Sequence, residues 1–253
     1  MDCYLSVRDF FSSTKDPGSS LQKIAPIAQI SLEKSKKVEI PKSPFEIVNG
    51  GMLRVNVKEL TWVRTASLTA NRGDLRFARN PGLFNEGLGT FLYKAFMGES
   101  SFLAVVEGEG IVYLSTGFHK VVLIYVNDET INIQGCNILA FESRLKHKIE
   151  VMGDLSGLAI GGLSFVNFSG SGWIAVAVCG EPVTIESRAE YALETIPVRT
   201  LAWSVGMQPE VQTDVTRINL MGRGVSDILN MKFVGDGFVV IHNSEEYMYP
   251  KIK

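Results

Sequence analysis

Short runs in which apolar and polar residues alternate dominate the chain from Phe45 onward, and apolar stripes with helical spacing are scarce. In one such run the alternate positions are Phe102, Ala104 and Val106. A period of two predicts β-strands that turn one face to a core. The pattern therefore predicts an all-β fold.

A pair of glycines separated by one residue ends this run and recurs twice along the chain. The three copies are Gly108-Glu109-Gly110, Gly170-Ser171-Gly172 and Gly235-Asp236-Gly237, with spacings of 62 and 65 residues. Because glycine tolerates positive φ, a Gly-x-Gly between two β-rich runs predicts a hairpin turn. We predict three repeats, each closed by such a hairpin, at residues 45–118, 119–180 and 181–243.

The strands that lead into the glycine pairs are predicted to bury one face each. In the second copy the positions on that face are Ser164, Val166 and Phe168, and in the third copy they are Leu229, Met231 and Phe233. The other face changes from Leu103 and Val105 in the first copy to Asn230 and Lys232 in the third. We expect the first strand to be covered on both faces and the third to present its polar face to water.

A second recurring piece lies upstream of each glycine pair. Leu139-Ala140-Phe141 aligns with Leu201-Ala202-Trp203 at the same offset of 62, and Leu68 aligns with Leu139 in a weaker third copy. Both pieces recur in the same order, which favours one β domain over residues 45–243 built from related units.

The connections into the glycine runs are rich in both glycine and apolar residues. The first contains Leu88, Phe91, Leu92 and Phe96. An apolar loop does not belong in water, so it either packs over the end of its own sheet or contacts another chain. We favour the second interpretation and predict a homo-oligomer that associates through these four side chains.

Several of these pieces together resemble the family of altered inheritance of mitochondria protein twenty-four. They are Gly98-Glu99-Ser100 after the apolar loop, the run FLAVVEGEGIVYLS, the LAF and LAW strands, and GEPVTIE from Gly180. The resemblance covers about residues 45–243. It implies a β-sandwich or double-stranded β-helix-like body of three units with pseudo-threefold symmetry, similar to the trp RNA-binding attenuation protein superfamily. By its name it also implies a link to mitochondrial biogenesis in eukaryotes. The family has no agreed molecular activity, so no catalytic residues are carried over from it.

The two ends of the chain differ from this domain. Residues 1–44 are rich in Ser, Lys and Pro and are predicted to be a loosely attached extension, and residues 244–253 a C-terminal tail. Neither a secretion signal nor a membrane-length apolar run is evident, so we expect no membrane span and a cytoplasmic location, or a mitochondrial one in a eukaryote. Three cysteines without CxxC spacing favour a reducing compartment and buried thiols.

Composition and motifs point away from catalysis. A formal charge of −2 and a pI near 6.0 argue against a nucleic-acid partner. The three histidines form no His-x-His pair, and neither Gly-x-Ser-x-Gly nor a complete dinucleotide loop occurs, so no metal, cofactor or enzymatic activity is expected. Arg144, Lys146 and Lys148 would share one face of a strand, either as a small anion patch or as a solvated edge strand.

The hypothesis that follows is a non-enzymatic structural or scaffold protein that associates with itself through its apolar glycine-rich loops. The alternative is a ligand-binding module that takes a small molecule or RNA in clefts between the repeats. Another protein partner remains unidentified.

Overall fold

β-strands account for nearly all regular structure in the described part of the chain. The computed structural model describes residues 5–6, 41–48, 51–79, 103–117, 119–151, 164–213 and 229–243. The loop residues Leu88, Phe91, Leu92 and Phe96 lie outside these ranges. Within them, the helical segments are 3-10 turns of three residues, η1 (Thr65–Ser67), η3 (Gly135–Asn137) and η4 (Pro197–Arg199). The predicted all-β class is confirmed.

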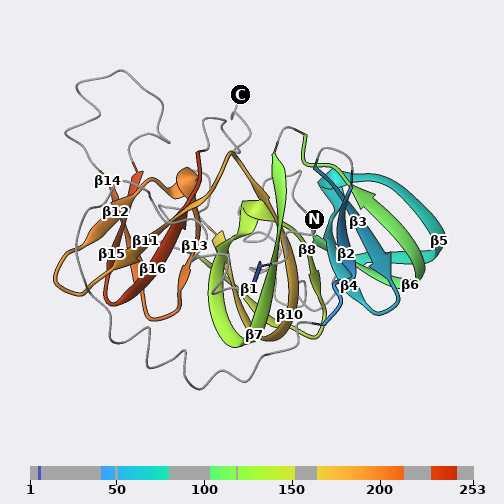
Figure 1. The fold of residues 1–253 in the computed structure, drawn as a ribbon, viewed down its shortest axis with the longest axis horizontal. Helices are drawn as coiled ribbons and strands as arrows, with labels where there is room; N and C mark the ends of the chain where they lie inside the picture. Colours follow the sequence, from blue (N-terminus) through green and yellow to red (C-terminus); the bar gives the residue numbers. More distant parts are fainter. Residues whose placement is uncertain are drawn as a thin grey trace.

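The strands form three lobes that lie in a row along the longest axis of the molecule (Figure 1). The first lobe contains β2 (Phe45–Val48), β3 (Met52–Val57), β4 (Thr61–Arg64), β5 (Leu68–Arg79) and β6 (Leu103–Leu114). The central lobe contains β7 (Lys120–Gln134), β8 (Ile138–Glu142), β9 (Lys146–Val151) and β10 (Ser164–Val178). The third lobe contains β11 (Val183–Ser187), β12 (Leu193–Thr195), β13 (Thr200–Ser204), β14 (Gln208–Thr213), β15 (Leu229–Val234) and β16 (Gly237–Ile241).

One continuous sheet connects the three lobes. Its strand order is β11-β16-β13-β7-β10-β8-β4-β6-β3-β2, with β5 and β9 added beside β6 and β10, and a separate sheet has the order β12-β15-β14. β4 pairs with β8 between the first two lobes, and β7 pairs with β13 between the last two. The lobes are therefore joined by backbone hydrogen bonds as well as by side-chain packing.

The glycine pairs do not form the predicted hairpins. β6 runs straight through Gly108-Glu109-Gly110, and β10 runs through Gly170-Ser171-Gly172. Gly235-Asp236 separates β15 from β16, which belong to different sheets and do not pair with each other. In each case the glycines let a strand leave one layer and enter another, and strands that switch layers do so at bends and bulges. The hairpin prediction was wrong because positive φ permits a bend as readily as a reversal.

The bend in the central lobe is a β-bulge. The register of β10 with β7 shifts between Gly170 and Ser171, which leaves Asp128 of β7 without an opposite residue. Asp128 has a φ of 51°, and its N–H donates to Ser171 Oγ at 2.9 Å. The hydroxyl thus satisfies the backbone donor that the bulge removes from the ladder.

Each 3-10 turn is followed by a strand with a bulge at its second residue. The skipped residues are Thr69 in β5, Leu139 in β8 and Leu201 in β13. The alignment of Leu139 with Leu201 therefore agrees with the backbone. Leu68 is one residue out of place in that alignment, because Thr69 occupies the bulge position and Leu68 is exposed.

The predicted core faces are buried wherever the structure describes them. Val106, Val166, Phe168, Met231 and Phe233 are almost inaccessible to water. On the opposite face, Leu103 and Val105 are buried as well, whereas Asn230 and Lys232 are half-buried. The first strand is therefore covered on both faces, and the polar face of the third is only partly exposed.

Two short pieces of the N-terminal extension contact the central lobe. β1 (Leu5–Ser6) pairs with β7 in parallel, with Leu5 opposite Ile124. Pro41 accepts a hydrogen bond from the indole of Trp173. Among the described residues, no helix is long and apolar enough to cross a membrane.

Candidate functional site

The three cationic residues of the predicted anion patch do not share one strand face. Lys146 and Lys148 lie on β9, but Arg144 lies in the turn between β8 and β9. The prediction treated the whole segment as one extended strand, and the reversal at Ser143-Arg144 removes Arg144 from the row. In the described structure β9 pairs only with β10, so its exposed lysines stand at an edge of the sheet.

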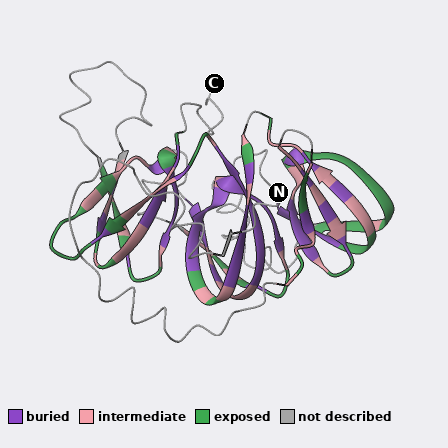
Figure 2. Cartoon of the chain, in the orientation of Figure 1, coloured by how far each residue is buried: buried purple, intermediate pink, exposed green. Residues whose placement is uncertain are grey.

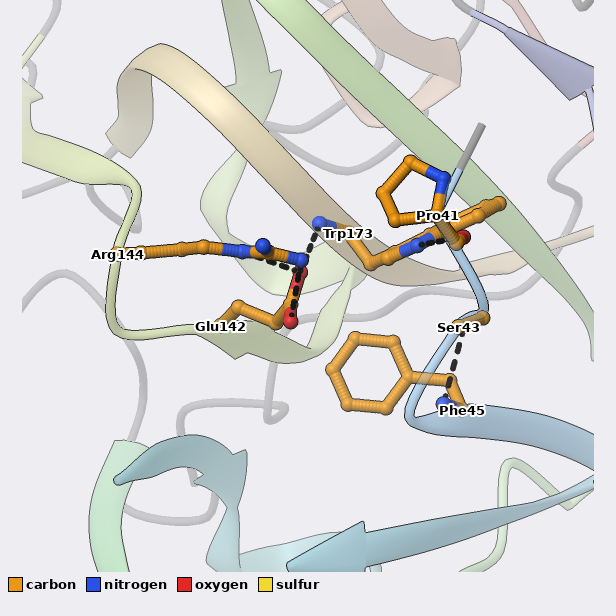
Figure 3. A network of polar contacts seen from close by, with 6 residues as sticks. All are labelled: Pro41, Ser43, Phe45, Glu142, Arg144 and Trp173. Atoms are coloured by element: carbon orange, nitrogen blue, oxygen red, sulfur yellow. Dashed lines mark hydrogen bonds and ion pairs between the residues drawn. The ribbon is translucent and has the colours of Figure 1, made fainter. Parts of the chain in front are cut away.

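Arg144 is engaged in a structural network (Figure 3). Its guanidinium donates to both carboxylate oxygens of Glu142, with Nη2 2.6 Å from Oε2 and 2.7 Å from Oε1. Glu142 Oε2 also accepts the Trp173 backbone N–H at 2.7 Å, and the Trp173 indole donates to the Pro41 carbonyl at 3.2 Å. Glu142 therefore fastens β8 to β10, and Trp173 extends the network to the segment that precedes β2. Arg144 holds the Glu142 carboxylate in place and balances its charge.

The remaining cations of the patch make a weak anion site. Lys148 Nζ lies 3.0 Å from Glu150 Oε1, and both side chains are partly exposed. Lys146 is exposed beside them on the same face of the strand. A nearby carboxylate neutralises part of the positive potential, so this geometry fits a solvated, lysine-protected edge better than a phosphate site.

A polar face continues inward from these lysines and was missed in the sequence. Lys148 is opposite Asn167 of β10, which is opposite Asn132 of β7, which in turn is opposite Trp203 of β13. The amide of Asn167 donates to Asn132 Oδ1 at 2.8 Å. In the next row, Gln134 is opposite Phe165. The signal was present as the alternation of Asn132 and Gln134 with two isoleucines in the run TINIQ.

Two buried polar atoms on this face lack a hydrogen-bond partner. They are Gln134 Oε1 and Trp203 Nε1, whose residues are 2% and 0% exposed. One is an acceptor and the other a donor, and both belong to strands at the junction between the central and third lobes. Buried polar atoms are nearly always satisfied, because leaving one unpaired costs about 1–3 kcal/mol. The junction between the central and third lobes thus carries one unsatisfied donor and one unsatisfied acceptor.

Burial moves the pKa of His242 away from neutrality, to about 4. Its Nδ1 accepts the Cys179 backbone N–H at 3.1 Å, and Nε2 lies 3.3 Å from the Val198 carbonyl. These contacts require the neutral tautomer that carries its proton on Nε2. The neutral imidazole, which follows β16, therefore connects the end of β10 in the central lobe with η4 in the third lobe.

His147 is also held neutral by burial, which lowers its pKa. Its ring contacts the edges or faces of Trp62 and Phe141, with centroid distances of 4.9 and 5.0 Å. This histidine is a packing residue at the junction of the first and central lobes.

Cys136 interacts with the Arg64 guanidinium but is not activated. Burial raises the pKa of Cys136 to about 11, and the Arg64 guanidinium only partly opposes this. Arg64 donates to the Cys136 carbonyl and to Ser67 Oγ, and so joins η3 to the first lobe. Cys136 and Cys179 are free and half-buried, less enclosed than predicted. No group of three potential metal ligands occurs in the part of the chain that the structure describes.

Comparisons with known proteins identify relatives of the fold and of the sequence. The family model described as "Mitochondrial biogenesis AIM24" matches residues 45–244. The crystal structure of protein SPYM3_0169 from Streptococcus pyogenes is similar with a TM-score of 0.60 and 16% identity, and the match covers 79% of this chain and 93% of that one. At that identity the similarity concerns the fold alone. A search of curated proteins found no match.

Proposed function

Because the chain belongs to the mitochondrial biogenesis AIM24 family, we propose that it is a non-enzymatic structural protein of that family, which acts by association. The observation that carries the proposal is that burial moves the pKa values of two histidine side chains and one cysteine side chain away from the working pH. His242, His147 and Cys136 all have a pKa displaced away from neutrality by burial. A general base or nucleophile needs a pKa near the working pH, so these groups are suited to holding the fold together.

The recurring strand scheme supports a body of three related units. Each lobe has a central element that pairs with strands on both of its edges. This element is β6 in the first lobe, β10 in the central lobe and the two consecutive strands β15 and β16 in the third. In every lobe the pairing partner on at least one edge changes along this element. Each lobe also has its 3-10 turn and the bulge after it. We infer that the lobes are three copies of one ancestral unit, as the sequence repeats imply.

Self-association through the apolar loop is part of this proposal. Leu88, Phe91, Leu92 and Phe96 belong to the connection between β5 and β6, and large apolar side chains on a connecting segment are typical of contact surfaces. The location proposed is the cytoplasm, or the mitochondrion in a eukaryote.

The test is native mass spectrometry of the full chain with the variants Leu88→Glu, Phe91→Glu and Phe96→Glu. We expect the wild type to be oligomeric and the variants to dissociate with an unchanged far-UV circular dichroism spectrum. Lys58→Glu, an exposed site in the turn between β3 and β4, serves as the control. An unchanged mass in all three loop variants would refute association through this loop.

A second candidate function rests on the unpaired atoms at the lobe junction. A small polar molecule that accepts from Trp203 Nε1 and donates to Gln134 Oε1 would satisfy both. The same mass spectra test it, since a bound molecule adds a constant mass to each chain, and Gln134→Leu should abolish that addition. If chains purified gently carry no extra mass, this function is ruled out.

The RNA version of the alternative has its own test. The double variant Lys146→Glu with Lys148→Glu should weaken salt-dependent RNA binding, and Arg144 is left unchanged because it holds Glu142.

A further inference from the structure

The two junctions between lobes have the same strand register. Trp62 of β4 is opposite Phe141 of β8, and Asn132 of β7 is opposite Trp203 of β13. In both pairs, one residue lies three positions before a 3-10 turn begins and the other lies four positions after the next such turn ends. The next pair in each ladder, Val63 with Ala140 and Ile133 with Ala202, follows the same rule.

A third pair of strands, β12 and β5, has residues at the same positions relative to the 3-10 turns, but these two strands do not pair with each other. By the same count Glu194 of β12 corresponds to Trp62 and Asn132, and Asn71 of β5 corresponds to Phe141 and Trp203. Among the described strands, β12 pairs only with β15, and β5 pairs only with β6. β5 and β12 lie at opposite ends of the row of lobes, so they do not meet within one chain (Figure 1).

Exposed apolar side chains gather in the two end lobes. Among the described residues, the large apolar side chains that are exposed are Ile47, Leu68 and Phe77 in the first lobe and Tyr191, Val205 and Val234 in the third. Figure 2 shows the same contrast, with exposed strand segments in the outer lobes, β5 above all, and a largely buried central lobe. Of these, Leu68 and Phe77 lie on the unpaired edge strand β5, and Tyr191 lies just before β12. Exposed apolar surface on an unpaired sheet edge is typical of a contact region.

The charges of the two edges are complementary. β5 carries Arg72 and Arg76 with Asp74, and is net positive along this stretch. β12 carries Glu194, and Glu190 lies four positions before it, so this edge is net negative. A second copy of this chain therefore offers each edge a partner of opposite charge.

We propose that copies of this chain associate end to end by strand pairing between β5 of one copy and β12 of the next, in the register of the internal junctions. Asn71 is then opposite Glu194 of the partner subunit, Ala70 opposite Thr195 of the partner subunit, and Arg72 opposite Leu193 of the partner subunit. The inference rests on the proposed self-association but uses a different surface from the apolar loop. The contact is heterologous, so each copy keeps one edge available for another and assembly continues until a ring closes or a filament forms.

The test is a charge series at Asn71, a site that is exposed in the isolated chain. Sedimentation velocity of the full chain over a concentration series would compare wild type, Asn71→Lys and Asn71→Glu. Opposite charges across strands attract and like charges repel, so we expect Asn71→Lys to tighten association and Asn71→Glu to weaken it, by about two- to fivefold each. In a Glu194→Lys background the order of the two variants should invert. Glu186→Lys on β11 is the matched control and should leave the order unchanged.

The outcomes separate this inference from the loop proposal. Inversion of the order in the Glu194→Lys background supports contact between these two positions. A wild type that stays monomeric at the highest concentration overturns both end-to-end pairing and self-association. Oligomers that respond to the Phe91→Glu variant but not to the charge at Asn71 overturn end-to-end pairing and leave the loop proposal standing.

Discussion

At the scale of single residues, the polar groups of this protein hold segments together. Glu142, which Arg144 holds in place, fastens β8 to β10, Arg64 joins two lobes, and His242 bridges the end of β10 and η4. Of these side chains, the sequence singled out only Arg144, as a member of the cationic patch. Glu142, Arg64 and His242 pair with backbone atoms from distant parts of the chain, and such partners exist only after folding.

The histidine bridge predicts a specific pH dependence of stability. His242 has a pKa of about 4 in the folded chain against 6.5 in a free side chain, so the unfolded state takes up a proton first as the pH falls. We expect this group to contribute full stability above pH 6.5 and to lose roughly 3 kcal/mol of it between pH 6.5 and 4. Urea unfolding at a series of pH values measures the effect.

The control for this prediction is His242→Asn, which keeps an acceptor near the Cys179 N–H but does not titrate. The difference in unfolding free energy between wild type and variant should shrink as the pH falls from 6.5 to 4. A constant difference over that range would mean that His242 is not held neutral.

At the scale of elements, the long strands depend on glycines at their bends. Gly108 has a φ of 116°, and a Cβ there would overlap the Asp74 carbonyl oxygen of the neighbouring strand. The constraint comes from β5, which pairs with β6 along its whole length and follows the same bend. This glycine is required both by its backbone conformation and by the close approach of another strand.

We therefore predict that Gly108→Ala lowers the free energy of unfolding by about 3 kcal/mol or more. Gly117, with a φ of 67° and no atom near its missing Cβ, provides the control. Gly117→Asn should cost less than about 1 kcal/mol, since asparagine tolerates this conformation. Chemical denaturation of both variants measures the difference, and equal losses would contradict the account.

At the scale of the whole molecule, one of the three hydrophobic clusters in the described chain includes residues of all three lobes. Its buried members include Trp62 and Val105 from the first lobe, Phe168 from the central lobe, and Leu201 and Val240 from the third. The continuous sheet crosses the same boundaries. Opening any one lobe exposes apolar surface of its neighbour, so we expect the described domain to unfold in a single transition.

The three tryptophans provide one reporter in each lobe, at Trp62, Trp173 and Trp203. In each variant that retains a single tryptophan, with phenylalanine at the other two positions, the urea midpoint from fluorescence should coincide with the midpoint from far-UV circular dichroism of that variant. The phenylalanine substitutions will shift all midpoints of a given variant together. Separate fluorescence and circular dichroism midpoints within one variant would show that the lobes unfold independently.

The sequence by itself determined the all-β class, the order of the recurring pieces and the buried strand faces. These features depend on local alternation and on side-chain type, and both can be read without contacts. Val106, Val166 and Phe233 were placed in the core for this reason, and the structure buries all three. The alternation of Asn132 and Gln134 with isoleucines is present in the sequence, but the residues that these two side chains contact depend on which strands lie opposite.

Only the tertiary structure decided what the glycine pairs do and where the charged residues point. Gly170 permits a reversal or a bend, and the pairing of β10 with β7 along its length selects the bend. Arg144 does not line up with Lys146 and Lys148 because the chain reverses at Ser143-Arg144, and its guanidinium forms an ion pair with Glu142. The unpaired edges of β5 and β12 appear only when the lobes are assembled in a row, because an edge is defined by the absence of a neighbour among the described strands.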